Sequence, residues 1–600
     1  MQAIILAAGM GKRLKELTKE NTKCMVEVNG VSLIDRMLHQ IEKQDVSRII
    51  IVVGYEGKKL IEFITSLHIK NPITFIENPI YAKTNNIYSL YLAKDYLCEE
   101  DTLLFESDLI FDDSVISALV DDPRETLALV DKYQSWMDGT CVKIDEEDYI
   151  ESFIPGSKFD FGERRSYFKT VNIYKFSKRF SQTHYVPFLE AYTKALGNNE
   201  YYEQVLRVIT MLDEPGIQAK RLNGQLWYEI DDIQDLDIAT SMFAPDSDTK
   251  LNMIQDRYGG YWRYPQLIDF CYLVNPYFPP KKLVDEIKAS FDKLLTQYPS
   301  GMKVNSLLAA KNFSVRQENI IVGNGAAELI KSLMNSIKGR CGFIKPTFDE
   351  YPNRYQEEDS VVFYPDNPDY SYASDDLIRF FDDKSIKNLV IVNPDNPTGN
   401  YIPKLGLLKL INWAKEKSIK LVIDESFADF ADEKDNTLID QEILDDNPHL
   451  YVVKSISKSY GVPGLRLGVV ASGDVQTIDK MKKDVAIWNI NSFAEFYLQI
   501  EEKYKKQYLS SLEKIKAERN RFISELSSID GLRAIPSQAN YLMVKLENVS
   551  SKELTKKLFA KYSILVKNLS KKICVGNYLR IAVRNTEDNN ILIEALKKEV

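Results

Sequence analysis

The chain has 600 residues, too many for one ordinary hydrophobic core, and at about 150 residues per domain it predicts several lobes or two enzyme-sized domains. Its 26 glycines and 22 prolines are too few for a collagen-like or low-complexity chain. The formal net charge of −10 argues against a general nucleic-acid binder.

The six cysteines are scattered and form no CxxC pair, so the sequence predicts neither a zinc site nor a disulfide framework. No apolar run approaches the roughly 18 residues that cross a bilayer. Met1 leads almost directly into an apolar strand, which is not the pattern of a signal peptide. We therefore expect a cytoplasmic protein with reduced cysteines and no partner among nucleic acids or membranes.

The first part of the chain alternates between strand and helix patterns. Apolar runs at residues 2–7, 48–53 and 102–106 end in turn residues, and 33–42 has the spacing of a helix. This alternation predicts an α/β domain with a largely parallel sheet over residues 1–240. Residues 241–256 lose the periodicity and carry a proline and small polar residues, which indicates a linker.

A second α/β pattern fills residues 257–600, where lysine- and glutamate-rich helical stretches separate short apolar runs. A long helix is expected from about residue 495, followed by strands near 541–545 and 579–583. The other expected strands are 320–322, 361–364, 389–392, 421–423, 450–453 and 468–471.

The first candidate site begins at the turn after residue 7. Gly9 and Gly11 let backbone N–H groups approach an anion closely, and Arg13 follows them. Together with Lys23, ten residues after Arg13, this segment resembles the signature of the sugar-phosphate nucleotidyltransferase superfamily; Thr22 stands where a proline is usual.

Further motifs resemble the phosphocholine cytidylyltransferase branch of that superfamily, over about residues 1–240. They are Glu77-Asn78-Pro79, the 84–90 segment, the 169–174 segment and the 227–231 segment. The resemblance implies a Rossmann-like nucleotidyltransferase fold that binds CTP. The implied nucleotide-binding residues are Ala8, Gly9, Gly11, Arg13, Lys23, Thr84, Asn85 and Ser89.

The chemistry of such a domain brings two anions together, which calls for Mg²⁺ held by carboxylates. Asp108 lies at the C-terminal end of a strand, where ligands of open α/β sheets bind. The superfamily pattern implies metal ligands at Asp108 and Asp231, and with Lys23 these are the expected catalytic residues. Glu229 either joins them or orients a lysine.

The acceptor of the nucleotide needs partners of its own. Tyr133, Trp136 and Asp138 offer aromatic faces and a carboxylate, a combination that suits an ammonium group, although an exposed loop explains them equally well. Lys169, Asn172 and Glu229 complete the expected acceptor-binding set.

The second candidate site gathers four motifs in residues 257–600. Lys458 is flanked by serines with Arg466 eight residues on, Asn393–Gly399 reads NPDNPTG, Asp424 ends a buried-looking strand, and Gly323–Glu328 opens a helix. This set resembles fold-type I aminotransferases and implies a fold with large and small subdomains that binds pyridoxal 5'-phosphate.

That resemblance assigns roles to individual residues. Lys458 would hold the cofactor and shuttle the proton, Asp424 would pair with its ring nitrogen, and Asn396 would donate to its ring oxygen. Phe427 replaces the usual tyrosine and removes one donor. Arg580 is the implied substrate-carboxylate residue, with Arg584 a weaker candidate. The other implied cofactor residues are Gly325, Ala326, Ala327, Phe348, Ser455, Arg466 and Tyr298, the last supplied from a second subunit of a homodimer.

Phe427 and the 257–260 segment look most like the histidinol-phosphate aminotransferase and threonine-phosphate decarboxylase group. A metabolite shared by both sites would carry a phosphorus anion and a primary amine. The expected function is cytidylylation of 2-aminoethylphosphonate with CTP, fused to transamination of phosphonoacetaldehyde by an amino-acid donor. Phosphocholine or phosphoethanolamine as acceptor, and decarboxylation or a histidinol-phosphate-like transamination as the second reaction, remain alternatives. A scaffolding role for either half is the non-enzymatic alternative, which the retained Lys23, Asp108, Asp231, Asp424 and Lys458 disfavour.

Overall fold

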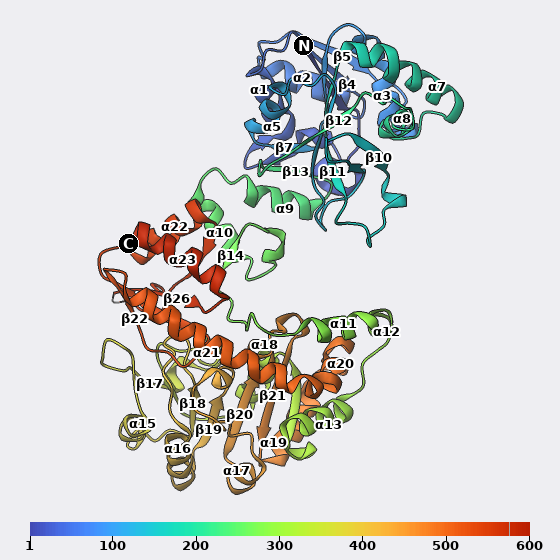
Figure 1. Ribbon diagram of the computed structural model, residues 1–600. Helices are drawn as coiled ribbons and strands as arrows, with labels where there is room; N and C mark the ends of the chain where they lie inside the picture. Colours follow the sequence, from blue (N-terminus) through green and yellow to red (C-terminus); the bar gives the residue numbers. More distant parts are fainter. Residues whose placement is uncertain (575) are drawn as a thin grey trace. The chain divides into compact units, whose positions relative to one another are not determined.

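The computed structural model describes residues 1–574 and 576–600 and divides into two compact units, Met1–Arg263 and Tyr264–Val600. Along these described ranges, no helix combines the length and the apolar character needed to cross a membrane. Each unit is built on its own sheet (Figure 1).

The first unit contains a nine-stranded sheet in which a parallel half meets an antiparallel half. The parallel strands, in spatial order, are β6 (Thr102–Glu106), β1 (Gln2–Ala7), β4 (Ile49–Val53) and β5 (Ile73–Glu77). The antiparallel half is formed by β8 (Leu127–Lys132), β9 (Cys141–Ile144), β10 (Ile150–Ile154) and β11 (Phe168–Phe176), and β12 (Gln218–Arg221) pairs with β8. The sheet is therefore less parallel than expected, because the short β9–β10 connection has no room for a crossover helix.

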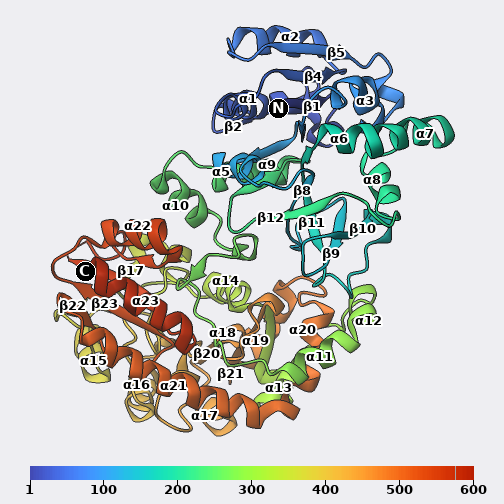
Figure 2. The same ribbon diagram turned by 45° about the horizontal axis from the view of Figure 1, so that its top comes forward.

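Strand alternation positions the helices on the two faces of this sheet. Ala3 and Ile5 of β1 belong to the buried cluster that includes α1 (Leu33–Glu42), whereas Ile4 and Leu6 belong to the cluster that includes α3 (Asn86–Leu92) (Figure 2). The remaining helices of this part are α2 (Gly57–Ser66), α4 (Lys94–Leu97), α5 (Asp113–Val120), α6 (Lys178–Phe180), α7 (Val186–Leu196) and α8 (Glu203–Ile209).

The segment expected as a linker, 241–256, is mostly helical. Helix α9 (Ile233–Met242) is followed by α10 (Ser247–Asp256), and the first unit extends to Arg263. Asp246 caps α10 by accepting from the backbone N–H groups of Asp248 and Thr249, and Leu251 is buried. The polar residues that suggested a linker thus include a helix cap.

The second unit contains a seven-stranded sheet with the order β15-β21-β20-β19-β18-β16-β17. All neighbours are parallel except β21, which is antiparallel to both of its partners. The strands are β15 (Ile320–Asn324), β16 (Cys341–Ile344), β17 (Ser360–Phe363), β18 (Asn388–Val392), β19 (Lys420–Asp424), β20 (Leu450–Ser455) and β21 (Leu467–Ser472). The six strands expected here are found, and β16 is the one that the sequence pattern missed.

A smaller antiparallel sheet forms the end of the second unit, from β22 (Leu532–Ala534), β23 (Tyr541–Leu546), β25 (Lys567–Asn568) and β26 (Asn577–Ala582). The expected long helix is divided into α20 (Ser492–Ile500) and α21 (Lys505–Ser527), and Figure 1 shows α21 running from near α20 toward β22. Helices α22 (Ser551–Tyr562) and α23 (Thr586–Glu599) pack beside this sheet; the others in the unit are α11 (Lys281–Ala289), α12 (Phe291–Thr296), α13 (Met302–Phe313), α14 (Ala326–Ser336), α15 (Ser374–Phe381), α16 (Lys404–Glu416), α17 (Gln441–Asp446), α18 (Ile456–Ser459) and α19 (Val475–Asp484).

Candidate active sites

The glycine turn after β1 has the backbone that the sequence predicts. Gly11 has φ 57°, and a Cβ there would lie 3.0 Å from Cβ of Lys23, so this position favours glycine. A Cβ at Gly9 would meet nothing within 4 Å, which leaves open space above the backbone. Residues Lys12–Thr18 form a short 3-10 segment rather than an α-helix. The turn thus gives an anion close access to the backbone.

Lys23 is the centre of an ion network at the carboxyl edge of the sheet. Its Nζ lies 2.5 Å from Oδ2 of Asp108 and 2.6 Å from Oδ1 of Asp231, and Arg13 Nη2 also lies 2.6 Å from that Asp231 oxygen. Burial acts to lower the pKa of Lys23, but the two carboxylates outweigh it and raise the pKa above its ordinary value. The ammonium is therefore charged over the whole physiological range.

A two-stranded ladder brings the distant carboxylates together. β13 (Trp227–Glu229) pairs antiparallel with β7 (Leu109–Phe111), so that Asp231 follows one strand and Asp108 precedes the other. Asp108, Glu229 and Asp231 each offer one oxygen, and these oxygens lie within 4.8 Å of one another. Oδ1 of Asp108 is buried and finds no hydrogen-bond partner among the residues that the structure describes. This donor set fits Mg²⁺, which prefers carboxylate oxygens.

Glu229 also contacts two of the residues expected at the acceptor site. Its Oε2 lies 3.3 Å from Nζ of Lys169, and its Oε1 accepts from Nδ2 of Asn172 at 3.3 Å. Burial raises the pKa of Glu229 to about 7, partly offset by Lys169. Glu229 is therefore close enough to Asp108 and Asp231 to share a metal ion with them, and close enough to Lys169 to pair with it.

Three other residues expected to bind the acceptor, Tyr133, Trp136 and Asp138, contact different neighbours. Trp136 stacks on Tyr228 with ring centroids 4.3 Å apart, whereas Tyr133 packs against Phe159 at 4.7 Å. Asp138 is exposed and accepts from the backbone N–H of Gly139. These side chains face separate neighbours and do not converge as one aromatic cage.

The segment expected to contact the nucleoside is held by Asn78. Nδ2 of Asn78 donates to Oγ1 of Thr84 and to Oγ of Ser89, both at 3.2 Å. Oδ1 of Asn85 caps α3 at 2.9 Å. Ala8 is buried at the end of β1 and lies close to Gly54. Asn78 thus fixes the hydroxyl groups of Thr84 and Ser89 relative to each other.

In the second unit, Asp424 ends β19 as a buried carboxylate. Its Oδ2 accepts from the hydroxyl of Tyr351 and its Oδ1 from the backbone N–H of Ser426, both at 2.8 Å. Burial raises the pKa of Asp424, and these hydrogen bonds oppose the change. A carboxylate fixed in this way can pair with a protonated ring nitrogen.

Lys458 lies on α18, directly after β20, and its backbone oxygen accepts from Asn275 N–H at 3.0 Å. Burial, then Arg580 and Arg466, lower the pKa of Lys458 to about 8, against the smaller opposing effect of Asp424. A lysine with this pKa has an appreciable neutral fraction near pH 8, which is the form that attacks an aldehyde.

The expected phosphate cradle lies at the start of α14. Gly325 has φ 75°, its N–H donates to the carbonyl of Arg466 at 2.7 Å, and a Cβ at this position would lie 2.6 Å from Nη2 of Arg466. The helix N-terminus supplies the amides of Ala326 and Ala327. Ser455 is buried at the end of β20. Backbone donors and a guanidinium thus adjoin one another, which fits a phosphate monoester.

Arg580 on β26 reaches the same site. Its Nη1 donates to Oδ1 of Asn396 at 2.8 Å and its Nη2 to the carbonyl of Cys271 at 2.7 Å. Its buried Nε has no hydrogen-bond partner within residues 1–574 and 576–600. Arg584 bonds to Asp588 and to the Asp269 carbonyl instead. Of the two arginines, Arg580 is the one hydrogen-bonded to a residue expected to bind the cofactor, Asn396.

Three aromatic residues were also expected at or near the cofactor: Phe348, Phe427 and Tyr298. Phe348 is partly exposed and meets Tyr351 edge to face, and Phe427 meets Tyr541 in the same way. Tyr298 is 79% exposed and stacks on Trp488 with ring centroids 4.4 Å apart. Tyr298 therefore presents its ring at the surface of the chain. Overall, the lysine, the buried carboxylate and the glycine cradle fit pyridoxal 5'-phosphate.

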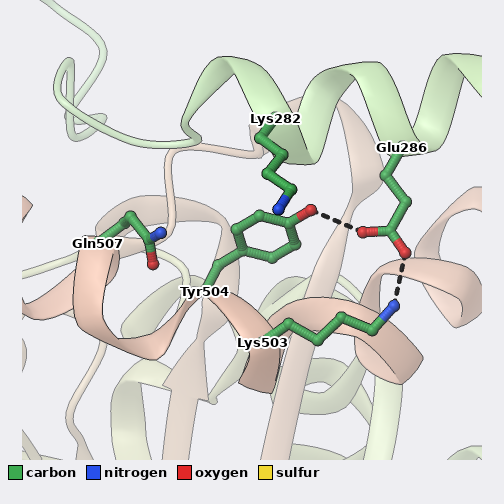
Figure 3. Close-up of a pocket in the computed structure, with 5 residues that line it drawn as sticks. All are labelled: Lys282, Glu286, Lys503, Tyr504 and Gln507. Atoms are coloured by element: carbon green, nitrogen blue, oxygen red, sulfur yellow. Dashed lines mark hydrogen bonds and ion pairs between the residues drawn. The ribbon is translucent and has the colours of Figure 1, made fainter.

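A pocket on the second unit is lined by residues outside both expected sites (Figure 3). Glu286 of α11 accepts from Nζ of Lys503 and from the hydroxyl of Tyr504, both at 2.6 Å, and Lys282 and Gln507 complete the lining. Both carboxylate oxygens are thus used to join α11 to the 3-10 segment Glu501–Tyr504, which directly precedes α21.

These two sites define an enzyme that combines a nucleotidyltransferase domain with an aminotransferase-type domain. Residues 266–596 match the family model for aminotransferase class I and II, and residues 3–138 match the MobA-like NTP transferase domain. The chain belongs to the aminotransferase class I and II family. The expected fold class, a nucleotidyltransferase fold joined to a fold-type I fold, is confirmed.

Relatives match both the whole chain and its second part. A CMP-5'-(3-aminopropyl)phosphonate synthase of Streptomyces rubellomurinus is 29% identical over 100% of this chain and 95% of its own length. An L-serine phosphate decarboxylase of Sulfurospirillum multivorans is 34% identical over 55% of this chain and 87% of its own length. The structure of a decarboxylase from the same organism is 31% identical with a TM-score of 0.52, covering 56% of this chain and 90% of that one.

The sequence did not single out Glu106 and Glu203 as site residues. Both carboxylates interact electrostatically with Asp108 and Glu229, although Glu203 lies on α8, far from either in the chain. Glu106 stands two residues before Asp108, a spacing that could have drawn attention to it. Glu203 has no local motif, so only the fold reveals its place.

Proposed function

We propose that the chain is a bifunctional enzyme of phosphonate or phospho-amine metabolism. The second unit produces a short primary amine that carries a phosphonate or phosphate group. The first unit transfers CMP from CTP to an oxygen of that group and releases pyrophosphate. The observation that carries the proposal is the pairing of the Lys23–Asp108–Asp231 network with the buried Lys458 and Asp424 in one chain.

In the first unit, the chemistry joins two anions at the α-phosphorus of CTP. Gly9, Gly11 and Arg13 bind the triphosphate, and Lys23 neutralises charge that develops on the leaving pyrophosphate. Asp108 and Asp231 would hold Mg²⁺, with Glu229 beside them, and the ion would supply charge neutralisation between the reacting groups. Thr84, Asn85 and Ser89 would contact the nucleoside of CTP.

In the second unit, Gly325, Ala326 and Ala327 bind the phosphate of pyridoxal 5'-phosphate with Arg466, and Asp424 keeps the ring nitrogen protonated. The cofactor supplies an electron sink for the carbon next to the substrate amine. Lys458 would hold the cofactor, and its Nζ would carry the proton that moves in the reaction. Arg580 binds a substrate anion through its planar fork.

Two reactions of the second unit would yield the amine, and we propose decarboxylation of a phosphorylated or phosphonate-bearing amino acid. The similarity to proteins named L-serine phosphate decarboxylase, at 34% and 29% identity, supports this choice. Loss of CO₂ from O-phosphoserine leaves phosphoethanolamine, and loss of CO₂ from phosphonoalanine leaves 2-aminoethylphosphonate. In both reactions the bond from Cα to the carboxylate breaks, CO₂ leaves, and one proton is added to Cα in its place.

Transamination of phosphonoacetaldehyde is the second candidate for this unit. The position of Arg580 supports it, because an arginine that binds the carboxylate of an amino-acid donor leaves the Cα–H bond to be broken. A histidinol-phosphate aminotransferase of Ruminiclostridium cellulolyticum, 30% identical over 53% of this chain, also supports it.

One experiment with the full chain separates these proposals. Purified protein is incubated with CTP, Mg²⁺ and 2-aminoethylphosphonate, phosphoethanolamine or phosphocholine, and pyrophosphate and the CMP product are followed by phosphorus NMR. The precursors O-phosphoserine, phosphonoalanine and phosphonoacetaldehyde with an amino donor are supplied in parallel. Stoichiometric CO₂ without a keto acid supports decarboxylation, and a keto acid without CO₂ supports transamination. Absence of pyrophosphate with all three acceptors would refute the first-unit proposal.

A further inference from the structure

The interior of the first unit contains a carboxylate that forms no ion pair within 4.0 Å among the described residues. Glu203, the first residue of α8, has a side chain that is only 4% exposed, and its Oε2 has no hydrogen-bond partner in the described part of the chain. An unpaired buried carboxylate is costly, because burial removes the water that would solvate its charge. Such a group is a candidate to bind a cation from outside.

The neighbouring cations already have partners. Lys23 is paired with Asp108 and Asp231, and Lys169 is paired with Glu229. Across residues 1–574 and 576–600, no lysine or arginine nitrogen lies within 4.0 Å of the carboxylate of Glu106 or Glu203. Glu106 accepts from Nδ2 of Asn86 at 3.2 Å. Among the described residues, Glu106 and Glu203 thus lack an ion-pair partner of their own, and Lys169, which is paired with Glu229, acts on Glu203 only from beyond 4.0 Å.

Asn86 links the segments that carry these two carboxylates: its Nδ2 donates to Oε1 of Glu106 at 3.2 Å, and its Oδ1 accepts from the backbone N–H of Tyr202, the residue before Glu203, at 3.0 Å. Burial, then Asp108 and then Glu203, raise the pKa of Glu106 well above its ordinary value. The charges of Lys169, Glu229 and Asp108 in turn affect the pKa of Glu203. Glu106 is only half-buried at the end of β6, so the pair reaches from the edge of the site toward the interior.

Buried tyrosines pack around the residue that precedes Glu203: the hydroxyl of Tyr185 donates to the carbonyl of Tyr202 at 3.2 Å. Next to burial, Glu203 is the largest cause that raises the pKa of the buried Tyr174, Tyr185 and Tyr202. The rings of Tyr174 and Tyr202 meet edge to face with centroids 5.7 Å apart. A carboxylate among tyrosine rings is the environment that attracts an organic ammonium. The candidate metal ligands, in contrast, are Asp108, Glu229 and Asp231.

We propose that Glu203, with Glu106 beside it, binds the primary ammonium of the acceptor substrate and so makes the first unit specific for short aminoalkyl phosphonates or phosphates. This inference rests on the proposed function of the first unit. A primary ammonium has three N–H donors for these carboxylates and the Asn86 region, whereas a trimethylammonium has none and is larger. It also replaces the role expected for Asp138, which lies at the surface.

The test compares an amine with its analogue that lacks the amine. 2-Aminoethylphosphonate, ethylphosphonate and phosphocholine are titrated into the full chain with Mg²⁺ and a non-hydrolysable CTP analogue, and CMP transfer from CTP is measured separately. Glu203→Gln should weaken binding of 2-aminoethylphosphonate by roughly 30-fold or more, as expected for loss of one partner of a buried charge pair. Binding of ethylphosphonate and of the nucleotide should stay at the wild-type level.

Glu200→Gln is the matched control, because Glu200 is exposed on the segment just before α8 and should bind all probes as wild type does. If Glu203→Gln does not fold, Glu106→Gln is measured in the same way. The inference is wrong if these variants weaken the amine and its analogue equally, if they weaken neither, or if the wild type does not prefer the amine. If the wild type prefers the amine but transfers no CMP, the proposed function fails while the ammonium site stands.

Discussion

The backbone N–H of Ile230 donates to the carbonyl oxygen of Asp108 at 3.0 Å. This single bond extends the β7–β13 ladder and places Asp231 next to Asp108, where both contact Lys23. The candidate metal site is therefore assembled by strand pairing between segments that are distant in the chain.

Loss of either aspartate should abolish pyrophosphate release. Asp108→Ala or Asp231→Ala removes charge stabilisation from the reacting phosphates, and we expect a loss of about 100-fold or more in kcat. The second-unit reaction should continue, because Lys458 and Asp424 lie in the other compact unit. The exposed Asp121→Ala is the control. Activity of both variants within about tenfold of wild type would contradict the assignment.

Lys458→Ala should remove the visible absorbance of bound pyridoxal 5'-phosphate and all turnover of the second unit. Its CTP-dependent pyrophosphate release should remain near wild type when the amine is supplied. Lys417→Ala, which changes an exposed lysine paired with Asp382, serves as the control. A spectrum unchanged by Lys458→Ala would assign the cofactor lysine elsewhere.

The lowered pKa of Lys458, about 8, sets a pH window for cofactor binding. Since the neutral amine attacks the aldehyde, the rate at which cofactor-free protein binds pyridoxal 5'-phosphate should rise with pH and level off above about 8. With a lysine of ordinary pKa, the binding rate would continue to rise with pH up to about 10.5. The same shift makes folding less favourable at low pH, and this penalty should fade as pH rises from about 8 to 10.5. Stopped-flow absorbance measures the first effect.

Gly325→Ala should weaken binding of the cofactor. A Cβ at this position would lie 2.6 Å from Nη2 of Arg466, and its φ of 75° costs an alanine about 1 kcal/mol or more. Gly301→Ala is a matched control at the start of another helix, with φ −76° and no atom within 4 Å of the added Cβ. Equal cofactor affinities in the two variants, from equilibrium dialysis, would show that the cradle does not touch the phosphate.

The second unit should associate as a homodimer through its exposed apolar surface. Leu295, Tyr298, Ile487 and Trp488 are exposed on or beside α12 and α20, and Tyr298 is the residue expected to reach the partner's site. Ile487→Glu should shift the protein toward monomers in sedimentation velocity and lower second-unit activity, without affecting CTP turnover. A wild-type chain that sediments as a monomer at micromolar concentration would contradict this.

Motif residues were predictable because their neighbours in the chain position them. Lys458 and Asp424 each follow a short buried strand, so strand alternation and local spacing sufficed. The helix at Ser247–Asp256 was missed because only Leu251 and Ile254 are buried on it, which gives too weak a periodicity. Glu203 could not be found from sequence, because its neighbours Glu106 and Lys169 are brought to it by tertiary packing.

The C-terminal boundary of the first unit, at Arg263, decides where the chain can be divided into two fragments. A fragment that stops at residue 240 would cut α9 and lose the carbonyl of Phe243, which with that of Thr240 accepts from Asn29. It would also remove the buried Leu251 and Ile254 of α10. A division after Arg263 leaves each of these buried clusters whole on one side, so we expect each unit to fold when it is produced alone.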